Sequence, residues 1–161
     1  IPAYGAGVCP AGATCPLPRR ETDGEAALGS LIADGAALYA ACRRCAARSP
    51  HGARHVLEQL AREQQRTVRS LLAAYFLLTG RWRQPPVPAA GLQEPWLTAL
   101  RRVFLAESVL QRDCAALAEQ LENGCLRQLL AAEAERAAAR GKSLAALLEN
   151  SLTTANSLLK W

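Results

Sequence analysis

The chain has 161 residues, enough for one domain with a hydrophobic core and too few for two. Half of the residues are hydrophobic but only 5% are aromatic, and Ala and Leu dominate, which favours an all-α protein over a strand-rich one. The net charge is +5, yet the basic residues are dispersed and not interleaved with aromatic residues, so we expect no nucleic-acid partner.

The chain also gives no sign of a membrane segment. It has no apolar run of about 18 residues, the length that a membrane-spanning helix needs, so we expect no membrane partner. The sequence begins at Ile1 and contains no Met, so we expect the natural N-terminus not to be visible, and a removed leader stays open. With that reservation we expect a cytoplasmic protein.

Residues 1–23 hold Gly, Pro and two Cys without an apolar period, and we expect an irregular N-terminal arm followed by a helical bundle over 24–161. The first helix is predicted from Glu25 to the break at Pro50 and Gly52. Its predicted inward face recurs at three- and four-residue steps: Leu28, Leu31, Asp34, Leu38, Cys42 and Cys45.

A second helix is predicted from His51 to Leu78, with Gly80 as a C-terminal cap. Its apolar stripe includes Glu63. The segment that follows, 81–94, holds three Pro within four residues and therefore cannot be helical.

A third helix is predicted to begin near Pro95 and to carry Glu107 within its apolar stripe. The pair Asn123 and Gly124 indicates a tight turn, after which a fourth helix begins. That helix weakens at Gly141, so the remaining residues either continue it or form a short fifth helix.

The predicted skeleton is therefore two helical hairpins, 24–80 and 95–161, joined by the Pro-rich connection 81–94. Fourteen extended residues span roughly 46 Å, and a 28-residue helix is roughly 42 Å long. The connection can therefore run the full length of a bundle, which permits a four-helix bundle with one long crossover.

The two hairpins repeat one short motif. Glu63 and Arg66 form a Glu-x-x-Arg step in the second helix, and Glu133 and Arg136 form the same step 70 residues later. The preceding helix of each hairpin carries an acid in its stripe, Asp34 in one and Glu107 in the other. If all four acids face inward at one level, four carboxylates meet in an apolar core and require cations, because isolated buried carboxylates are costly.

The second-helix segment reads LEQLAREQQRTVRSLLAAYFLLTG, and with the duplicated motif it resembles the ferritin-like superfamily, in particular rubrerythrin-type bundles of bacteria. The resemblance covers residues 25 to about 150. It implies a four-helix bundle that holds two iron or manganese ions through one Glu from each of two helices and Glu-x-x-His from each of the other two. The positions equivalent to those ligands are Asp34, Glu63, Arg66, Glu107, Glu133 and Arg136.

The chain departs from that family at both histidine positions, which are Arg66 and Arg136. A guanidinium has a fixed positive charge and no lone pair for a metal, but it pairs well with carboxylates. We therefore expect an Arg–carboxylate network in place of the metal pair and no cofactor, in a structural or binding module that is not an enzyme. The alternative is a di-iron or di-manganese oxidoreductase, similar to rubrerythrin, catalase or ferroxidase, that uses the four carboxylates alone.

Two further features leave alternatives open. Each Glu-x-x-Arg step could be an ordinary surface pair on a helix. Alternatively, the arginine could point outward while the glutamate faces inward. Cys42 and Cys45 form a C-x-x-C step that could be a redox-active thiol pair, although buried cysteines also pack as small apolar residues. The resemblance also allows a homodimer, and the sequence does not identify a ligand.

Overall fold

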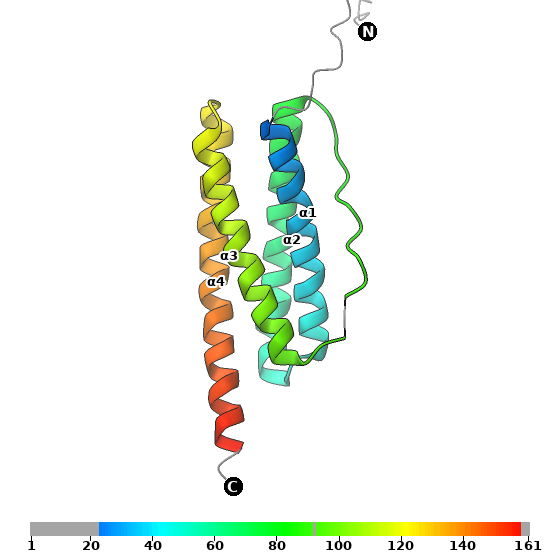
Figure 1. Ribbon diagram of the computed structural model, residues 1–161, viewed down its shortest axis with the longest axis vertical. Coiled ribbons are helices and arrows are strands. Elements are labelled where there is room, and N and C mark those ends of the chain that lie inside the picture. The colour runs from blue at the N-terminus through cyan, green and yellow to red at the C-terminus, as the bar shows by residue number, and fades with distance from the viewer. Residues whose placement is uncertain (1–22, 92, 159–161) are drawn as a thin grey trace, which may run out of the picture.

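The computed structural model describes residues 23–91 and 93–158, in which every regular element is a helix (Figure 1). The four helices are α1 (Asp23–Arg48), α2 (His51–Thr79), α3 (Trp96–Gln120) and α4 (Gly124–Leu158). The all-α prediction and the prediction of a four-helix bundle are therefore confirmed. Apart from Asp23, the expected N-terminal arm lies outside the described residues.

The helices form a bundle of two antiparallel pairs. α1 packs on α2 and α3 packs on α4, while α1 also contacts α3 and α2 also contacts α4. The described parts of α1 and α4 make no contact, nor do those of α2 and α3, so these pairs lie diagonally across the bundle. Figure 1 shows that each helix runs antiparallel to both of its neighbours, and that the irregular chain between α2 and α3 passes along the outside of the bundle.

Local signals end the helices close to where the sequence predicts. Gly80 follows α2 with φ 70°, a left-handed conformation that favours glycine, and its N–H donates to the carbonyl of Phe76. Asn123 precedes α4, and its Oδ1 accepts from the backbone N–H groups of Cys125 and Leu126 at 3.0 and 3.1 Å. Asn123 therefore acts as a helix N-cap, a role that the reading of a tight turn did not include.

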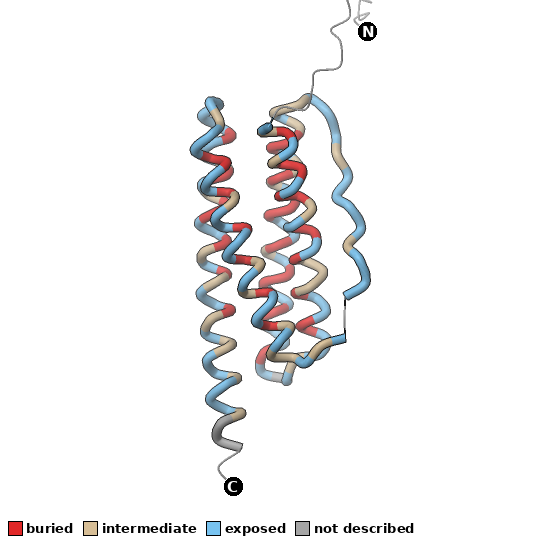
Figure 2. Tube along the Cα trace, in the orientation of Figure 1, coloured by how far each residue is buried: buried red, intermediate tan, exposed pale blue. Residues whose placement is uncertain are grey.

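α4 continues through Gly141 to Leu158, so the described chain has no separate fifth helix. Glycine lowers helix stability by about 1 kcal/mol relative to alanine, which is too little to break a helix that packs against neighbours. The C-terminal end of α4 extends beyond the other helices in Figure 1, and most residues from 149 to 155 are exposed (Figure 2).

The core lies between the four helices (Figure 2). Its largest fully buried apolar side chains come from all of them: Leu28, Ile32, Leu57, Leu71, Leu100, Leu110, Leu126, Leu130 and Leu144. No described helix is long and apolar enough to cross a membrane.

The predicted inward face of α1 is wrong at one position, because Asp34 is exposed. The helix faces two neighbours, so its buried surface is wider than one stripe and includes Gly35. A Cβ added at Gly35 would lie 3.2 Å from a methyl group of Val68, which shows how closely α1 approaches α2 there. Asp34 therefore lies at the margin of the contact with α3 instead of inside the core.

Candidate functional site

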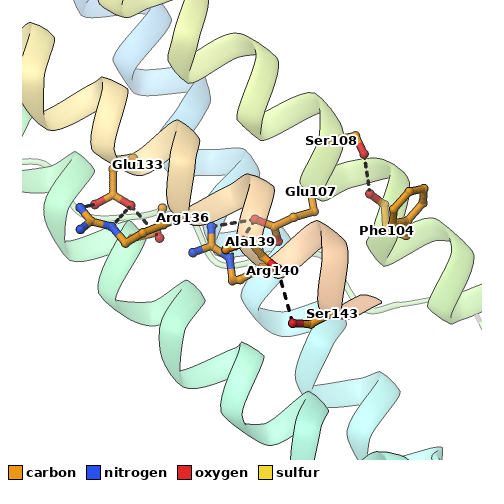
Figure 3. A network of polar contacts seen from close by, with 9 residues as sticks. Phe104, Glu107, Ser108, Glu133, Arg136, Ala139, Arg140 and Ser143 are labelled. Atoms are coloured by element: carbon orange, nitrogen blue, oxygen red, sulfur yellow. Dashed lines mark hydrogen bonds and ion pairs between the residues drawn. The ribbon is translucent and has the colours of Figure 1, made fainter. Parts of the chain in front are cut away.

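A buried ion pair links α3 to α4 in the middle of the bundle. Glu107 is 1% exposed and Arg140 is 2% exposed. The Nε of Arg140 donates to Glu107 Oε1 at 2.9 Å, and Nη2 lies 2.7 Å from the same oxygen (Figure 3). Nη2 is buried and has no hydrogen-bond partner. Its contact with Glu107 is therefore an attraction between charges and not a well-aligned hydrogen bond. The arginine thus neutralises a carboxylate that burial would otherwise make very costly.

A second buried carboxylate, Glu133, lies about two turns before Arg140 on α4 and has a different set of partners (Figure 3). Arg136 donates from Nη2 to Oε1 at 2.7 Å and from Nε to Oε2 at 3.3 Å. The hydroxyl of Thr67 on α2 donates to Oε2 at 2.9 Å. Glu133 is 1% exposed while the side chain of Arg136 is 55% exposed, so the arginine reaches the carboxylate from the surface.

These surroundings shift the pKa values of the two carboxyl groups, Glu107 and Glu133, in opposite directions. Burial raises the pKa of Glu107; the bond and charge of Arg140 oppose the shift and the charge of Glu63 adds to it. Burial acts in the same direction on Glu133, but hydrogen bonds from Arg136, Ser70 and Thr67 outweigh it and hold its pKa below the ordinary value.

Of the two other acids predicted for the network, Glu63 lies near Glu107 and Asp34 does not belong to this group. Glu63 is half-buried; it accepts from Gln59 Nε2 at 3.1 Å and is close enough for its charge to act on Glu107. Asp34 lies instead near Asp113 of α3: partial burial, and then the charge of Asp113, raise the pKa of Asp34.

Arg66 is exposed, and no carboxylate among the described residues pairs with it. The prediction that Arg66 bridges buried carboxylates is therefore wrong. The buried face of α2 runs through Gln64 and Thr67, which leaves Glu63 at its margin and Arg66 outside. The open alternative, in which the arginine points outward, describes the first Glu-x-x-Arg step correctly.

The residue that sequence reasoning missed is Arg140. The buried face of α4 includes a series at alternating four- and three-residue steps, Leu126, Leu130, Glu133, Ala137, Arg140 and Leu144, and it also includes Ala134. This strict spacing was visible in the sequence and places Arg140, rather than Arg136, on the inward face. Arg136 stands three positions after Glu133, as the Glu-x-x-Arg pattern requires, whereas the buried arginine lies one turn further along the helix.

Gln64 of α2 adds a further polar group to the core. The residue is 0% exposed, and neither Oε1 nor Nε2 has a hydrogen-bond partner. Its Nε2 lies 3.5 Å from the position that a Cβ on Gly35 would occupy, so the amide packs against the backbone of α1. A buried amide without a partner costs about 1–3 kcal/mol.

The cysteines of the predicted thiol pair are both buried and free. Burial, followed by the charges of Glu107 and Cys45, raises the pKa of Cys42 to about 12; the charge of Arg140 opposes this shift. Burial and then the charge of Glu94 raise the pKa of Cys45 to about 11, with Arg48 opposing. A thiol with so high a pKa is scarcely ionised near neutral pH, which disfavours thiolate chemistry at this pair.

The donor set does not fit a pair of metal ions. Three or more His, Cys, Asp or Glu side chains come together as a possible metal site nowhere in the described part of the chain. The oxygens that would ligate the ions are bonded by Arg140 at Glu107 and by Arg136 and Thr67 at Glu133. At both acids the counter-charge comes from a guanidinium group, Arg140 at Glu107 and Arg136 at Glu133.

The chain was compared with protein-family models, with curated proteins and with solved structures, and none of the three comparisons found a match.

Proposed function

We propose that this chain is a divergent ferritin-like bundle in which buried carboxylates paired with arginine take the place of the metal centre. It then acts as a structural or binding module without redox turnover. The observation that carries the proposal is the ion pair between Glu107 and Arg140, almost completely buried in the middle of the bundle. Glu107 occupies the position of a metal ligand in the family that the sequence resembles.

The duplicated hairpins support this proposal. At the 70-residue offset, Glu133 corresponds to Glu63 and Arg140 corresponds to Ser70. The second hairpin has kept its acids inside and paired them with arginine, while the first carries Asp34 on the surface and Ser70 bound to Glu133. A metal pair needs ligands from both hairpins, whereas an internal ion pair needs only one of them, so this asymmetry is expected once the metal is lost.

The stability of two arginine variants tests the role of the pair. Arg140→Ala leaves Glu107 buried without its counter-charge, and we expect a loss of about 3–5 kcal/mol in the free energy of unfolding, measured by urea denaturation. Arg66→Ala is the matched control, because Arg66 is exposed, and its expected effect is within about 0.5 kcal/mol. Equal effects of the two substitutions would contradict the proposal.

A third variant separates pairing from packing. Replacing both partners, with Glu107→Leu and Arg140→Met, removes the buried charges together and should recover most of the stability that Arg140→Ala loses. A double variant as unstable as Arg140→Ala would show that the pair does more than neutralise charge.

The metal-dependent alternative has its own measurement. The protein is incubated anaerobically with iron(II) or manganese(II), desalted and assayed by elemental mass spectrometry. We expect no stoichiometric metal. About two metals per chain, lost in Glu107→Ala and in Glu133→Ala, would overturn the proposal and support the oxidoreductase.

A further inference from the structure

A cavity of about 260 Å³ lies at the end of the bundle where α1 ends and α3 begins. Its walls come from the last two turns of α1, the first two turns of α3 and the chain just before α3. Cys45 lies at its inner side and the buried ion pair is not part of its lining. The cavity is therefore a separate feature from the core pairs.

Three arginines line this cavity: Arg44 and Arg48 on α1 and Arg102 on α3. The carboxylate of Glu94 also lines it and lies 2.9 Å from Nη2 of Arg102. Within the described ranges, Arg44 and Arg48 have no carboxylate partner. The charged side chains around the cavity therefore leave an excess of two positive charges.

The backbone before α3 passes close to one of these arginines. A Cβ on Gly91 would meet the guanidinium of Arg44, so an alanine there would require the end of this exposed side chain to move. The lining also includes apolar side chains of α3, namely Trp96, Ala99 and Val103. The first backbone N–H groups of α3 have no partner within the helix, and they add positive potential near Trp96.

We propose that this cavity binds a small organic phosphate monoester. The phosphoryl group, with close to two negative charges, contacts Arg44 and Arg48 and matches the charge excess. The organic part lies against Trp96 and Val103. The volume is near the lower limit for small-molecule sites and too small for a polypeptide or a nucleic-acid groove. The assignment does not depend on the fate of the metal centre.

The fluorescence of Trp96 reports on occupancy. The chain has three Trp residues, so a Trp82→Phe and Trp161→Phe background leaves the cavity indole as the only one. This protein is titrated with benzyl phosphate, inorganic phosphate and benzyl alcohol. We expect a saturable change with benzyl phosphate, a binding constant at least about tenfold weaker for inorganic phosphate, and no saturation with benzyl alcohol.

Charge variants locate the binding. Arg44→Ala and Arg48→Ala should each weaken benzyl phosphate binding by about tenfold or more, because each removes a charge-assisted contact. Arg43→Ala and Arg101→Ala carry the same change in net charge on the same helices without lining the cavity, and should leave the affinity nearly unchanged. Glu94→Gln should tighten binding, because it removes the one negative charge that faces the ligand.

Three outcomes would overturn the assignment. One is binding that falls equally in the Arg43 and Arg44 variants, which would indicate only a general attraction to a basic protein. Another is equal affinity for inorganic and benzyl phosphate, which would refute an organic ligand. The last is weaker binding in Glu94→Gln, a variant that stays informative even if an arginine variant fails to fold.

Discussion

At the scale of single residues, Glu107 and Glu133 show how burial and hydrogen bonding decide the state of a carboxyl group. Both are about 1% exposed, and burial favours the neutral form of each. Glu133 accepts hydrogen bonds from Nε and Nη2 of Arg136 and from two hydroxyl groups. Only one oxygen of Glu107 is contacted by Arg140, and Glu107 also lies near the charge of Glu63. The acid with fewer hydrogen-bond donors, Glu107, therefore keeps its proton to a higher pH than Glu133 does.

This difference predicts opposite pH dependences. The folded-state pKa of Glu107 lies above 4.5, so its contribution to stability is present below pH 4.5 and is lost as pH rises through that higher value. The folded-state pKa of Glu133 lies below 4.5, so its contribution is present above pH 4.5 and is lost as pH falls through that lower value. Carboxyl ¹³C NMR titration should give midpoints on opposite sides of 4.5.

The variants Glu107→Gln and Glu133→Gln assign the two resonances and serve as controls. Glu133→Gln should also flatten the acid limb of the stability–pH curve, whereas Glu107→Gln should not. Two midpoints on the same side of 4.5 would contradict the structure of one of these sites.

Some of this centre was predictable from sequence and some was not. The burial of Glu107 and Glu133 follows from their positions in three- and four-residue stripes, and Arg140 obeys the same spacing. The exposure of Arg66 and Asp34 does not follow from a single stripe, because each lies one position from a buried residue on a helix that faces two neighbours. Neighbouring residues on a helix point about 100° apart, so a difference of one position separates a core residue from a surface residue.

At the scale of elements, the helix ends were more predictable than the side-chain network. Gly80 and Pro50 are local signals whose effect does not depend on the rest of the fold. Gly141 was ambiguous for a physical reason: its local cost is small, and the packing of Leu144 and its neighbours decides whether the helix continues.

The two glycines should therefore respond oppositely to alanine. Gly80 has φ 70°, so Gly80→Ala should destabilise the protein by about 1 kcal/mol. Gly141 is helical and a Cβ there would meet nothing within 4 Å, so Gly141→Ala should stabilise by about 0.5–1 kcal/mol. Thermal unfolding followed by circular dichroism measures both, and the same sign for the two variants would contradict the backbone conformations.

At the scale of the whole molecule, four helices of unequal length share one core. α4 has 35 residues, and Leu144 is its last buried residue among the positions up to 155, for which burial is described. Its C-terminal end extends beyond the ends of the neighbouring helices (Figure 1). The segment after Leu144 has 14 residues, 145–158, and an isolated helix of about that length is marginal in water. The helical structure of these turns is therefore less stable than that of the rest of α4, unless another surface packs against them.

Native-state hydrogen exchange tests this dependence. We expect amides after Asn150 to exchange through local opening, much faster than those between Leu126 and Leu144, which require global unfolding. The exchange of these amides is followed by mass spectrometry at two protein concentrations. Protection of the projecting turns that increases with concentration would indicate instead that a second copy packs there, in a homodimer of the kind that the resemblance allows.

The antiparallel order of every neighbouring pair has one more consequence. A helix behaves like a bar with about half a positive charge at its start and half a negative charge at its end. Each end of this bundle contains two helix N-termini and two helix C-termini, and termini of the same kind lie diagonally opposite each other (Figure 1). The backbone field of the whole molecule is therefore close to that of a quadrupole and fades within a short distance. An approaching molecule is guided from afar only by the side-chain charge of +5, and senses a single helix end only on arrival.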